Sequence, residues 1–286
     1  MDDFLSRKIT RNIPNLKTKK EETIMKKNKM IITILGCMVF FLIAALVLLP
    51  AKQAKAETLV ESTLFFRIYI AFSVDQKAAQ AWLPAPWKAV SVPKGPFKGA
   101  NLYVLLNDKF IMQDGEGKPD MGGMYCYSAL IAFGKNQKTG EFSAFVTRIY
   151  WPYDDPHAYK NAVKATVSRE ATIKGATSKS GAGSEVWKVQ DSAGGILEFR
   201  MDYQRAVPKR AKREFKVRSS VKPDFFRIYR DDYASDLVKS IPIGIERVQN
   251  YQLRTTMTEL RKMFDGSEKL IGISVNPCRV RQVFLP

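Results

Sequence analysis

Short runs of β-branched and aromatic residues, several with polar residues at alternate positions, recur along the chain. Such runs predict β-strands, because successive side chains of a strand point to opposite faces of a sheet. The predicted strands lie at 63–73, 100–112, 125–134, 141–151, 185–191 and 196–204. Segments rich in turn-forming residues separate them, which favours an antiparallel meander over an alternation of strands and helices.

Three segments predict short helices. Residues 73–84 begin with a capping serine, Ser73, have an acidic first turn and stop at a proline. Residues 255–264 carry apolar residues on one helical face and are followed by Gly266, a typical C-cap. Residues 156–165 form the third predicted helix.

The pentapeptide FFRIY occurs at 65–69 and again at 225–229, and its last three residues return at 148–150. The spacing is too irregular for a solenoid of stacked repeats. We therefore expect three strands whose apolar side chains face inward and whose arginines face outward.

An uninterrupted apolar stretch at 31–49 follows the basic sequence KKNK and precedes a small-x-small site at 54–56. This is the layout of an export signal. The stretch has 19 residues and is long enough to span a bilayer, so a cleaved signal and a retained anchor are the two alternatives. Residues 1–24, before Met25, are either an upstream mis-start or a basic cytoplasmic tail. Either way, we expect the body of the protein in the periplasm or cell envelope.

The predicted organisation has a basic region at 1–30, a signal peptide or anchor at 31–56 and one domain at 57–286. No linker rich in proline and serine divides this last part. We predict a β-rich α+β fold, namely a single antiparallel β-barrel-like domain with a few short helices.

The exported part carries 35 basic and 24 acidic residues, a net charge of +11. Such a charge favours anionic surfaces, including lipid headgroups and acidic polymers, without naming a partner. The densest basic run, 205–222, indicates either a binding surface for an anionic membrane or a solvated hairpin end. Nucleic acid is not an expected partner, since no nucleic-acid-binding motif is present in an exported chain. The sequence sets no oligomeric state.

Cysteines and histidines are too few for a metal centre of the usual kinds. Outside the export segment, only Cys126 and Cys278 occur, and a disulfide and two thiols are both compatible with the sequence. His157 is the only histidine, which argues against His-rich metal sites and against a Ser-His-Asp triad elsewhere in the chain. We expect no metal and no cofactor, and we expect His157 to lie in a loop.

The order of the segments FRIYIAFSVDQKAAQAWLP, YCYSALIAFGKNQKTGEFSAFVTRIYW, PYDDPHAYKNAVKATVSREATIKG, GGILEFRMDY and VKPDFFRIYR resembles the acetoacetate decarboxylase family over nearly all of 57–286. The resemblance implies a β-barrel with a deep apolar pocket, in which a lysine forms a Schiff base with a β-keto acid. An ammonium group cannot attack a carbonyl, so the pKa of such a lysine must fall from about 10.4 toward neutrality. In acetoacetate decarboxylase, desolvation and a neighbouring cation lower it.

The family signature at the reactive lysine is G-R-E, four further residues, a proline and two adjacent lysines. In this chain Arg169 and Glu170 match the signature. Gly175 stands at the proline, and Ala176 and Thr177 stand at the two lysines. The resemblance therefore implies that the usual reactive position is empty.

Other positions near the implied site also differ from the family. Tyr127 stands where the family has a carboxylate, and Ser73 stands where it has an arginine. Lys174 lies two residues before Ala176, so the two share a face of a strand, and Lys174 is either a substitute amine or an exposed strand lysine. Tyr125 and Tyr127 also share a face, and they are either ligand-binding phenols or hydrogen-bonded core tyrosines.

Three functional hypotheses follow. The first is an exported binding protein for a small apolar or carboxylated organic molecule, with a deep aromatic cavity that holds no buried lysine or carboxylate. Its ligand-binding residues would be Tyr125, Tyr127, Ser73 and Ala176. The second is a carbon–carbon lyase of the decarboxylase kind, whose catalytic residues would be Lys174, Arg169 and Glu170. The third is an envelope module that binds anionic surfaces through 205–222.

Overall fold

The computed structural model describes residues 24–30, 35, 38, 56–177 and 180–286. Most of the predicted export segment at 31–49 lies outside the described residues. Within the described part of the chain, no helix is long and apolar enough to cross a membrane. Ala56–Pro286 form one compact unit, and this unit carries the cavity described below.

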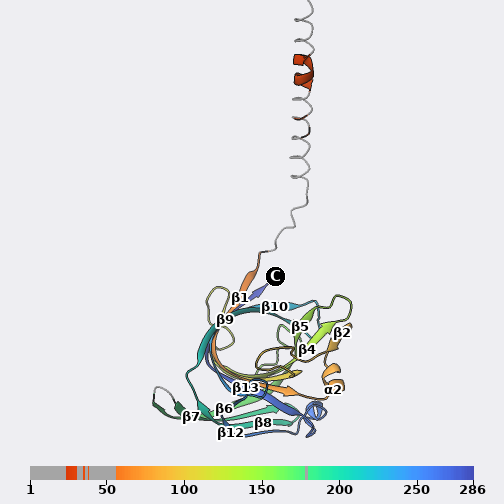
Figure 1. Ribbon diagram of the computed structural model, residues 1–286. Helices are drawn as coiled ribbons and strands as arrows, with labels where there is room; N and C mark the ends of the chain where they lie inside the picture. The colour runs from red at the N-terminus through yellow and green to blue at the C-terminus, as the bar shows by residue number, and fades with distance from the viewer. Residues whose placement is uncertain (1–23, 31–34, 36–37, 39–55, 178–179) are drawn as a thin grey trace, which may run out of the picture. The chain divides into compact units, whose positions relative to one another are not determined.

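The centre of this unit is a closed ring of strands (Figure 1). In ring order, the strands are β1 (Thr58–Ser73), β3 (Leu102–Asp114), β4 (Tyr125–Asn136), β5 (Phe142–Trp151), β9 (Lys209–Ser219), β10 (Phe226–Ser240) and β13 (Lys269–Leu285). β13 pairs with β1 and completes the ring. All neighbours in the ring run antiparallel except β5 and β9, which pair in parallel over a short stretch.

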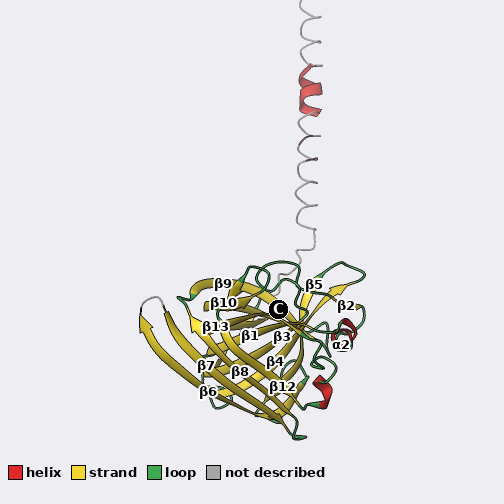
Figure 2. Ribbon diagram, turned by 60° about the horizontal axis from the view of Figure 1, so that its bottom comes forward, coloured by secondary structure: helices red, strands yellow, loops and turns green. Residues whose placement is uncertain are grey.

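A second layer of strands covers part of the outside of the ring (Figure 2). It consists of β6 (Ala162–Thr177), β7 (Ser180–Asp191), β8 (Ile196–Arg205) and β12 (Val248–Thr255), all paired antiparallel. A short parallel pairing of β5 with β6 joins this layer to the ring. The remaining elements are small: α2 (Gln76–Gln80), β2 (Trp87–Ala89), β11 (Ile245–Glu246) and the 3₁₀ turn η1 (Thr258–Leu260).

Strand β1 separates two cores, because its side chains alternate between the two faces of the sheet. Phe66 and Ile68 face the second layer, where the ring of Phe66 stacks on that of Trp187 with centroids 6.4 Å apart. Arg67 and Tyr69 face the interior of the ring. The core between the layers is therefore apolar, whereas the ring interior carries polar side chains.

The prediction of a β-rich domain with few helices is confirmed, but the predicted helices differ from the observed ones. The first is only one turn long, and its cap is Asp75 rather than Ser73, since the Asp75 carboxylate accepts hydrogen bonds from two backbone amides of that turn. The predicted helix at 156–165 is wrong, because β6 begins at Ala162 and pairs with β5 and β7. The predicted helix at 255–264 is reduced to η1 followed by turns.

The expectation that the FFRIY arginines face outward is also wrong. Arg67 is buried, and both Arg67 and Arg227 line the ring interior. The third repeat arginine, Arg148, is partly buried and pairs with Glu259 at 2.5 Å. A strand buried on both faces has no outward side, so charged side chains at alternate positions must be paired inside.

Candidate functional site

The ring encloses a cavity of about 170 Å³. Every strand of the ring contributes to its lining, and aromatic side chains are frequent in it. This volume is small for a ligand site, because sites for drug-sized molecules hold roughly 300–1,000 Å³. The cavity therefore suits a compact organic molecule.

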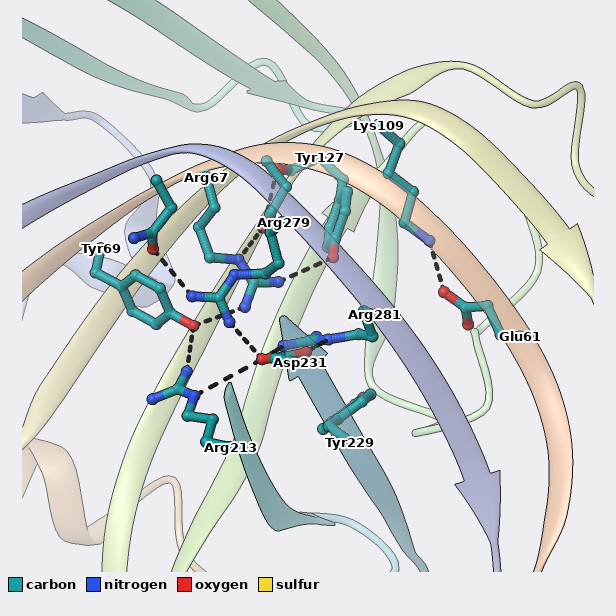
Figure 3. A network of polar contacts seen from close by, with 12 residues as sticks. Glu61, Arg67, Tyr69, Lys109, Tyr127, Arg213, Tyr229, Asp231, Arg279 and Arg281 are labelled. Carbon is teal, nitrogen blue, oxygen red and sulfur yellow. Dashed lines mark hydrogen bonds and ion pairs between the residues drawn. The ribbon is translucent and has the colours of Figure 1, made fainter. Parts of the chain in front are cut away.

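Four guanidinium groups gather around a single carboxylate (Figure 3), and three of them, those of Arg67, Arg213 and Arg281, line the cavity. We call this set the arginine cluster: Arg67, Arg213, Arg279, Arg281 and Asp231. Asp231 lies directly opposite Arg281 in the pairing of β10 with β13 and opposite Arg213 in the pairing of β9 with β10. The strand register therefore assembles the cluster from segments far apart in the sequence.

The Asp231 carboxylate holds the centre of the arginine cluster. Arg281 donates to both of its oxygens, at 2.7 and 2.9 Å, and Arg279 donates to one of them. The Nε atom of Arg213 lies 3.7 Å from the same carboxylate. Burial alone would raise the pKa of Asp231, but Arg281 and Arg279 outweigh burial and hold it well below its usual range. Asp231 is therefore charged at neutral pH.

Positive charge exceeds negative charge in the arginine cluster. Four guanidiniums surround one carboxylate, which leaves an excess of three charges when Tyr69 is neutral and of two when it is a phenolate. Burial, together with the neighbouring Arg67 guanidinium, lowers the pKa of Arg279 to about 10, although Tyr69 and Asp231 favour its charged form. Buried charge of one sign is unfavourable without a counter-ion, so the charge of the cluster is complementary to that of an anion.

Tyr69 lies within this field. Its hydroxyl oxygen accepts hydrogen bonds from Arg67 Nη1 at 3.0 Å and from Arg213 Nη2 at 2.8 Å. Burial alone would raise the pKa of Tyr69, but the guanidiniums, led by Arg279, outweigh burial and lower it to about 6. The phenol is therefore ionised over much of the neutral range.

We expect Tyr69 to titrate as a phenolate near pH 6, visible as a one-tyrosine step in absorbance near 295 nm. Tyr69→Phe should remove the step. Tyr103→Phe should keep it, because burial raises the pKa of Tyr103 although its ring packs against Tyr69. The unfolded chain holds the Tyr69 proton up to about pH 10, so this contribution to stability rises from about pH 6 to about 10 and is lost as the pH falls through 6. A titration without a step below pH 9 would contradict the assignment.

A second charged group lines the cavity around Glu61. We call it the lysine group: Lys109, Arg227 and Glu61. The Glu61 carboxylate accepts from Lys109 Nζ at 2.9 Å and from Arg227 Nη1 at 3.1 Å. Lys109 is 5% exposed and Glu61 is 7% exposed, so the Lys109–Glu61 ion pair is well shielded from solvent.

The lysine group keeps its charges at neutral pH. Burial would raise the pKa of Glu61, but the nearby Lys109 and Arg227 outweigh burial and lower it to about 2. Burial would likewise lower the pKa of Lys109, but the Glu61 carboxylate outweighs burial and raises it above its ordinary value. Lys109 is therefore an ammonium ion rather than a nucleophilic amine.

The expectation of a cavity without buried lysine or carboxylate is wrong, since both are present.

Tyr125 and Tyr127 line the cavity, as their shared strand face predicts. The Nζ atom of Lys109 lies 5.1 Å from the ring centroid of Tyr125 and 5.5 Å from that of Tyr127. The Tyr127 hydroxyl accepts from Arg67 Nη2 at 3.4 Å. Tyr127 thus contacts both charged groups of the cavity. A ligand-binding role for the two tyrosines stays a prediction.

The other predicted site residues lie away from the cavity lining. Lys174 and Glu170 are exposed on β6, and Ser73 ends β1. None of the three is among the described lining residues. The side chain of Ala176 lies outside the described residues. The catalytic role of Lys174 is untested, but the structure does not bring this lysine to the cavity.

Arg169 connects the two layers instead of facing the cavity. Its guanidinium pairs with Glu185 and with Asp108, each at 2.9 Å, and lies 3.7 Å from the ring centroid of Phe66. Burial would lower the pKa of Arg169, but its hydrogen bond to Glu185 and the further charged contacts raise it. The charge of Arg169 is therefore balanced by the two carboxylates that it binds.

His157 lines the cavity from a turn, in agreement with its expected place in a loop. Its ring packs between Trp151 and Tyr159, with centroids at 4.9 and 5.5 Å. Burial, and next the Arg227 guanidinium, lower its pKa to about 3, so the imidazole is neutral at pH 7. His157 adds no charge to the cavity.

The basic run at 205–222 is largely the ring strand β9 rather than a hairpin end. Arg213 points into the cavity, whereas Arg210 and Lys212 pair with Asp232 at 2.6 and 3.8 Å on the outer side. Binding of an anionic surface by this run stays a prediction.

Cys126 and Cys278 are free thiols, and Cys126 packs toward the core between the layers.

Sequence reasoning missed the charged residues of the cavity, although a signal for them exists. β1 and β13 both place arginine at alternate positions: Arg67 lies between Phe66 and Ile68, and Val280 separates Arg279 from Arg281. Alternation of this kind indicates one apolar face and one polar face, but it does not say which face is enclosed.

No protein-family model matches the chain, and no curated protein matches it. Solved structures match it over most of both chains. The enduracididine biosynthesis enzyme MppR, complexed with the condensation product of pyruvate and imidazole 4-carboxaldehyde, has a TM-score of 0.50 at 9% sequence identity and covers 82% of this chain and 92% of its own. The same enzyme with HEPES buffer bound has a TM-score of 0.50 at 8% identity, with coverages of 83% and 91%. Acetoacetate decarboxylase from Legionella pneumophila has a TM-score of 0.45 at 10% identity, with coverages of 84% and 90%. The two MppR matches show that the chain has the β-rich fold of the acetoacetate decarboxylase-like enzymes, and the resemblance in its sequence is confirmed at the level of the fold.

Proposed function

We propose that the protein binds a small organic anion, such as a carboxylate, in the ring cavity without forming a covalent bond to it. The observation that carries this proposal is the excess of buried guanidinium over carboxylate in the arginine cluster. Arginine forks bind carboxylates through paired, charge-assisted hydrogen bonds. An anionic ligand would supply the counter-charge that the chain itself lacks.

The state of the cavity lysine supports binding rather than Schiff-base chemistry. Lys109 is held as an ammonium by Glu61, and an ammonium cannot attack a carbonyl. At the position implied by the family resemblance the chain has Ala176, and Lys174 is exposed. A lyase that uses Lys174 is therefore the less favoured alternative.

The ligands of the fold relatives also support an anion. MppR is found with a pyruvate condensation product and with HEPES. HEPES carries a sulfonate, and a pyruvate product retains a carboxylate. The layout of residues 31–56 supports placing this binding in the periplasm or cell envelope.

Calorimetric titration with pyruvate and with its neutral amide tests the proposal. We expect pyruvate to bind and the amide not to bind, because only the acid carries a charge. Arg213→Gln should weaken pyruvate binding about ten-fold, since it removes one charged donor from the cavity wall. Arg210→Gln is the matched control, because Arg210 lies on the same strand but faces outward. Equal binding of acid and amide, or no binding of either, would overturn the proposal.

A further inference from the structure

Two separate cationic groups contribute side chains to the lining of the same cavity. The arginine cluster has four guanidiniums against the carboxylate of Asp231, and the lysine group has two cations against Glu61. Each group therefore has positive charge left over when the ionisable phenol of Tyr69 is set aside. An anion with one charged group can pair with only one of the two.

The two groups lie on either side of one phenol ring. Lys109 Nζ is 5.5 Å from the ring centroid of Tyr127, and Arg67 donates to the hydroxyl of the same residue at 3.4 Å. Figure 3 shows Lys109 and Glu61 beside the arginine cluster, with the side chain of Tyr127 between them. A short molecule that follows this ring can reach both groups.

Buried polar atoms without a partner occur in both groups. Among the described residues, Arg279 Nε in the arginine cluster and Arg227 Nε in the lysine group have no hydrogen-bond partner, and of these two arginines Arg227 lines the cavity. The hydroxyl of Thr63, which is 3% exposed and lines the cavity, also has none. Buried donors are nearly always paired in folded proteins, so the two that line the cavity, Arg227 Nε and the Thr63 hydroxyl, indicate polar groups of a bound ligand.

The rest of the cavity wall is apolar. Phe65, Leu105, Ile149 and Phe215 contribute side chains that offer no hydrogen bond to a ligand. A ligand that contacts these side chains needs a hydrocarbon stem between its charged ends. The cavity volume of about 170 Å³ limits the length of that stem.

We propose that the ligand is a short dicarboxylate. One carboxylate binds the arginine cluster, the other binds Arg227 and Lys109, and the hydrocarbon stem lies along the apolar wall. This inference rests on the proposed anion-binding function and specifies the chemical class of the anion.

Calorimetric titration of the full chain with succinate and glutarate, each compared with its monoamide, tests the inference. A monoamide keeps the size of the acid and removes one charge. We expect each diacid to bind at least about ten-fold more tightly than its monoamide, because a charge-assisted hydrogen bond contributes on that order. Arg227→Met should remove this preference, because it takes away the cation that the second carboxylate needs. Arg230→Met should keep it, because Arg230 lies on the same strand and pairs with Glu57 and Glu214 on the outer surface.

A second variant, Arg227→Lys, retains a cation at the same place and should retain part of the preference. Diacids that bind no more tightly than their monoamides to the unchanged chain would overturn the dicarboxylate inference and leave anion binding standing. No binding of any of these acids would overturn both. If circular dichroism shows that Arg227→Met does not fold, the comparison of each diacid with its monoamide on the unchanged chain still tests the dicarboxylate inference.

Discussion

Asp231→Asn is expected to lower the free energy of unfolding by about 3–5 kcal/mol, because it leaves a cluster of buried guanidiniums without its carboxylate. Arg279 and Arg281 both donate to Asp231, and asparagine keeps the shape of this side chain but not its charge. Urea unfolding followed by circular dichroism measures the change. The remaining excess of positive charge should also make the stability of the variant depend more strongly on added carboxylate than that of the unchanged chain.

The next residue along β10 is the matched control. Asp232 faces outward and pairs with Arg210 at the surface. Asp232→Asn should leave the free energy of unfolding nearly unchanged, because exposed ion pairs contribute little to stability. If both variants lose a similar amount of unfolding free energy, the charge of Asp231 does not stabilise the arginine cluster.

Glu61→Gln is expected to turn Lys109 from an ammonium ion into a reactive amine. Burial lowers the pKa of Lys109, and the Glu61 carboxylate is the largest of the groups that raise it, ahead of Tyr125 and Tyr127. Without that carboxylate, the Arg227 guanidinium that it binds becomes an unpaired cation nearby, which favours the neutral amine. A buried lysine beside a cation is the arrangement that makes the amine of acetoacetate decarboxylase nucleophilic. The variant should therefore form a Schiff base with acetoacetate.

Borohydride reduction in the presence of acetoacetate, followed by mass spectrometry, detects this change. We expect no adduct on the unchanged chain and an adduct on Lys109 in Glu61→Gln. The double variant Glu61→Gln with Lys109→Met should lose the adduct, which identifies the lysine. An adduct on Lys109 or Lys174 of the unchanged chain would contradict non-covalent binding and support Schiff-base chemistry as the function.

Local patterns predicted the strands with the most apolar character. The segments at 63–73, 125–134 and 141–151 all lie in ring strands close to their predicted bounds. β13 was not predicted, because its arginines and its asparagine interrupt the apolar pattern. Those arginines are tolerated in a central strand since Asp231, from a different strand, neutralises part of their charge. Such a partner cannot be identified from a window of neighbouring residues.

The predicted helix at 156–165 shows the same limit. Its alanines and lysines suit a helix by intrinsic propensity. In the structure, β5 offers Ala162 and the residues after it a free strand edge, and pairing with β7 extends the strand. Tertiary pairing outweighs a difference in propensity of a few tenths of a kcal/mol per residue.

By itself, the sequence determined the β-rich class, the basic character of the body and the shared face of Tyr125 and Tyr127. These properties depend on composition and on the two-residue period of a strand, which are local. Only the tertiary structure decided which face of each strand is enclosed by the ring, and therefore that Lys109 and Arg67 line the cavity while Lys174 does not. The physical reason is that the charge of a buried residue depends on its partners, and here those partners come from strands distant in sequence.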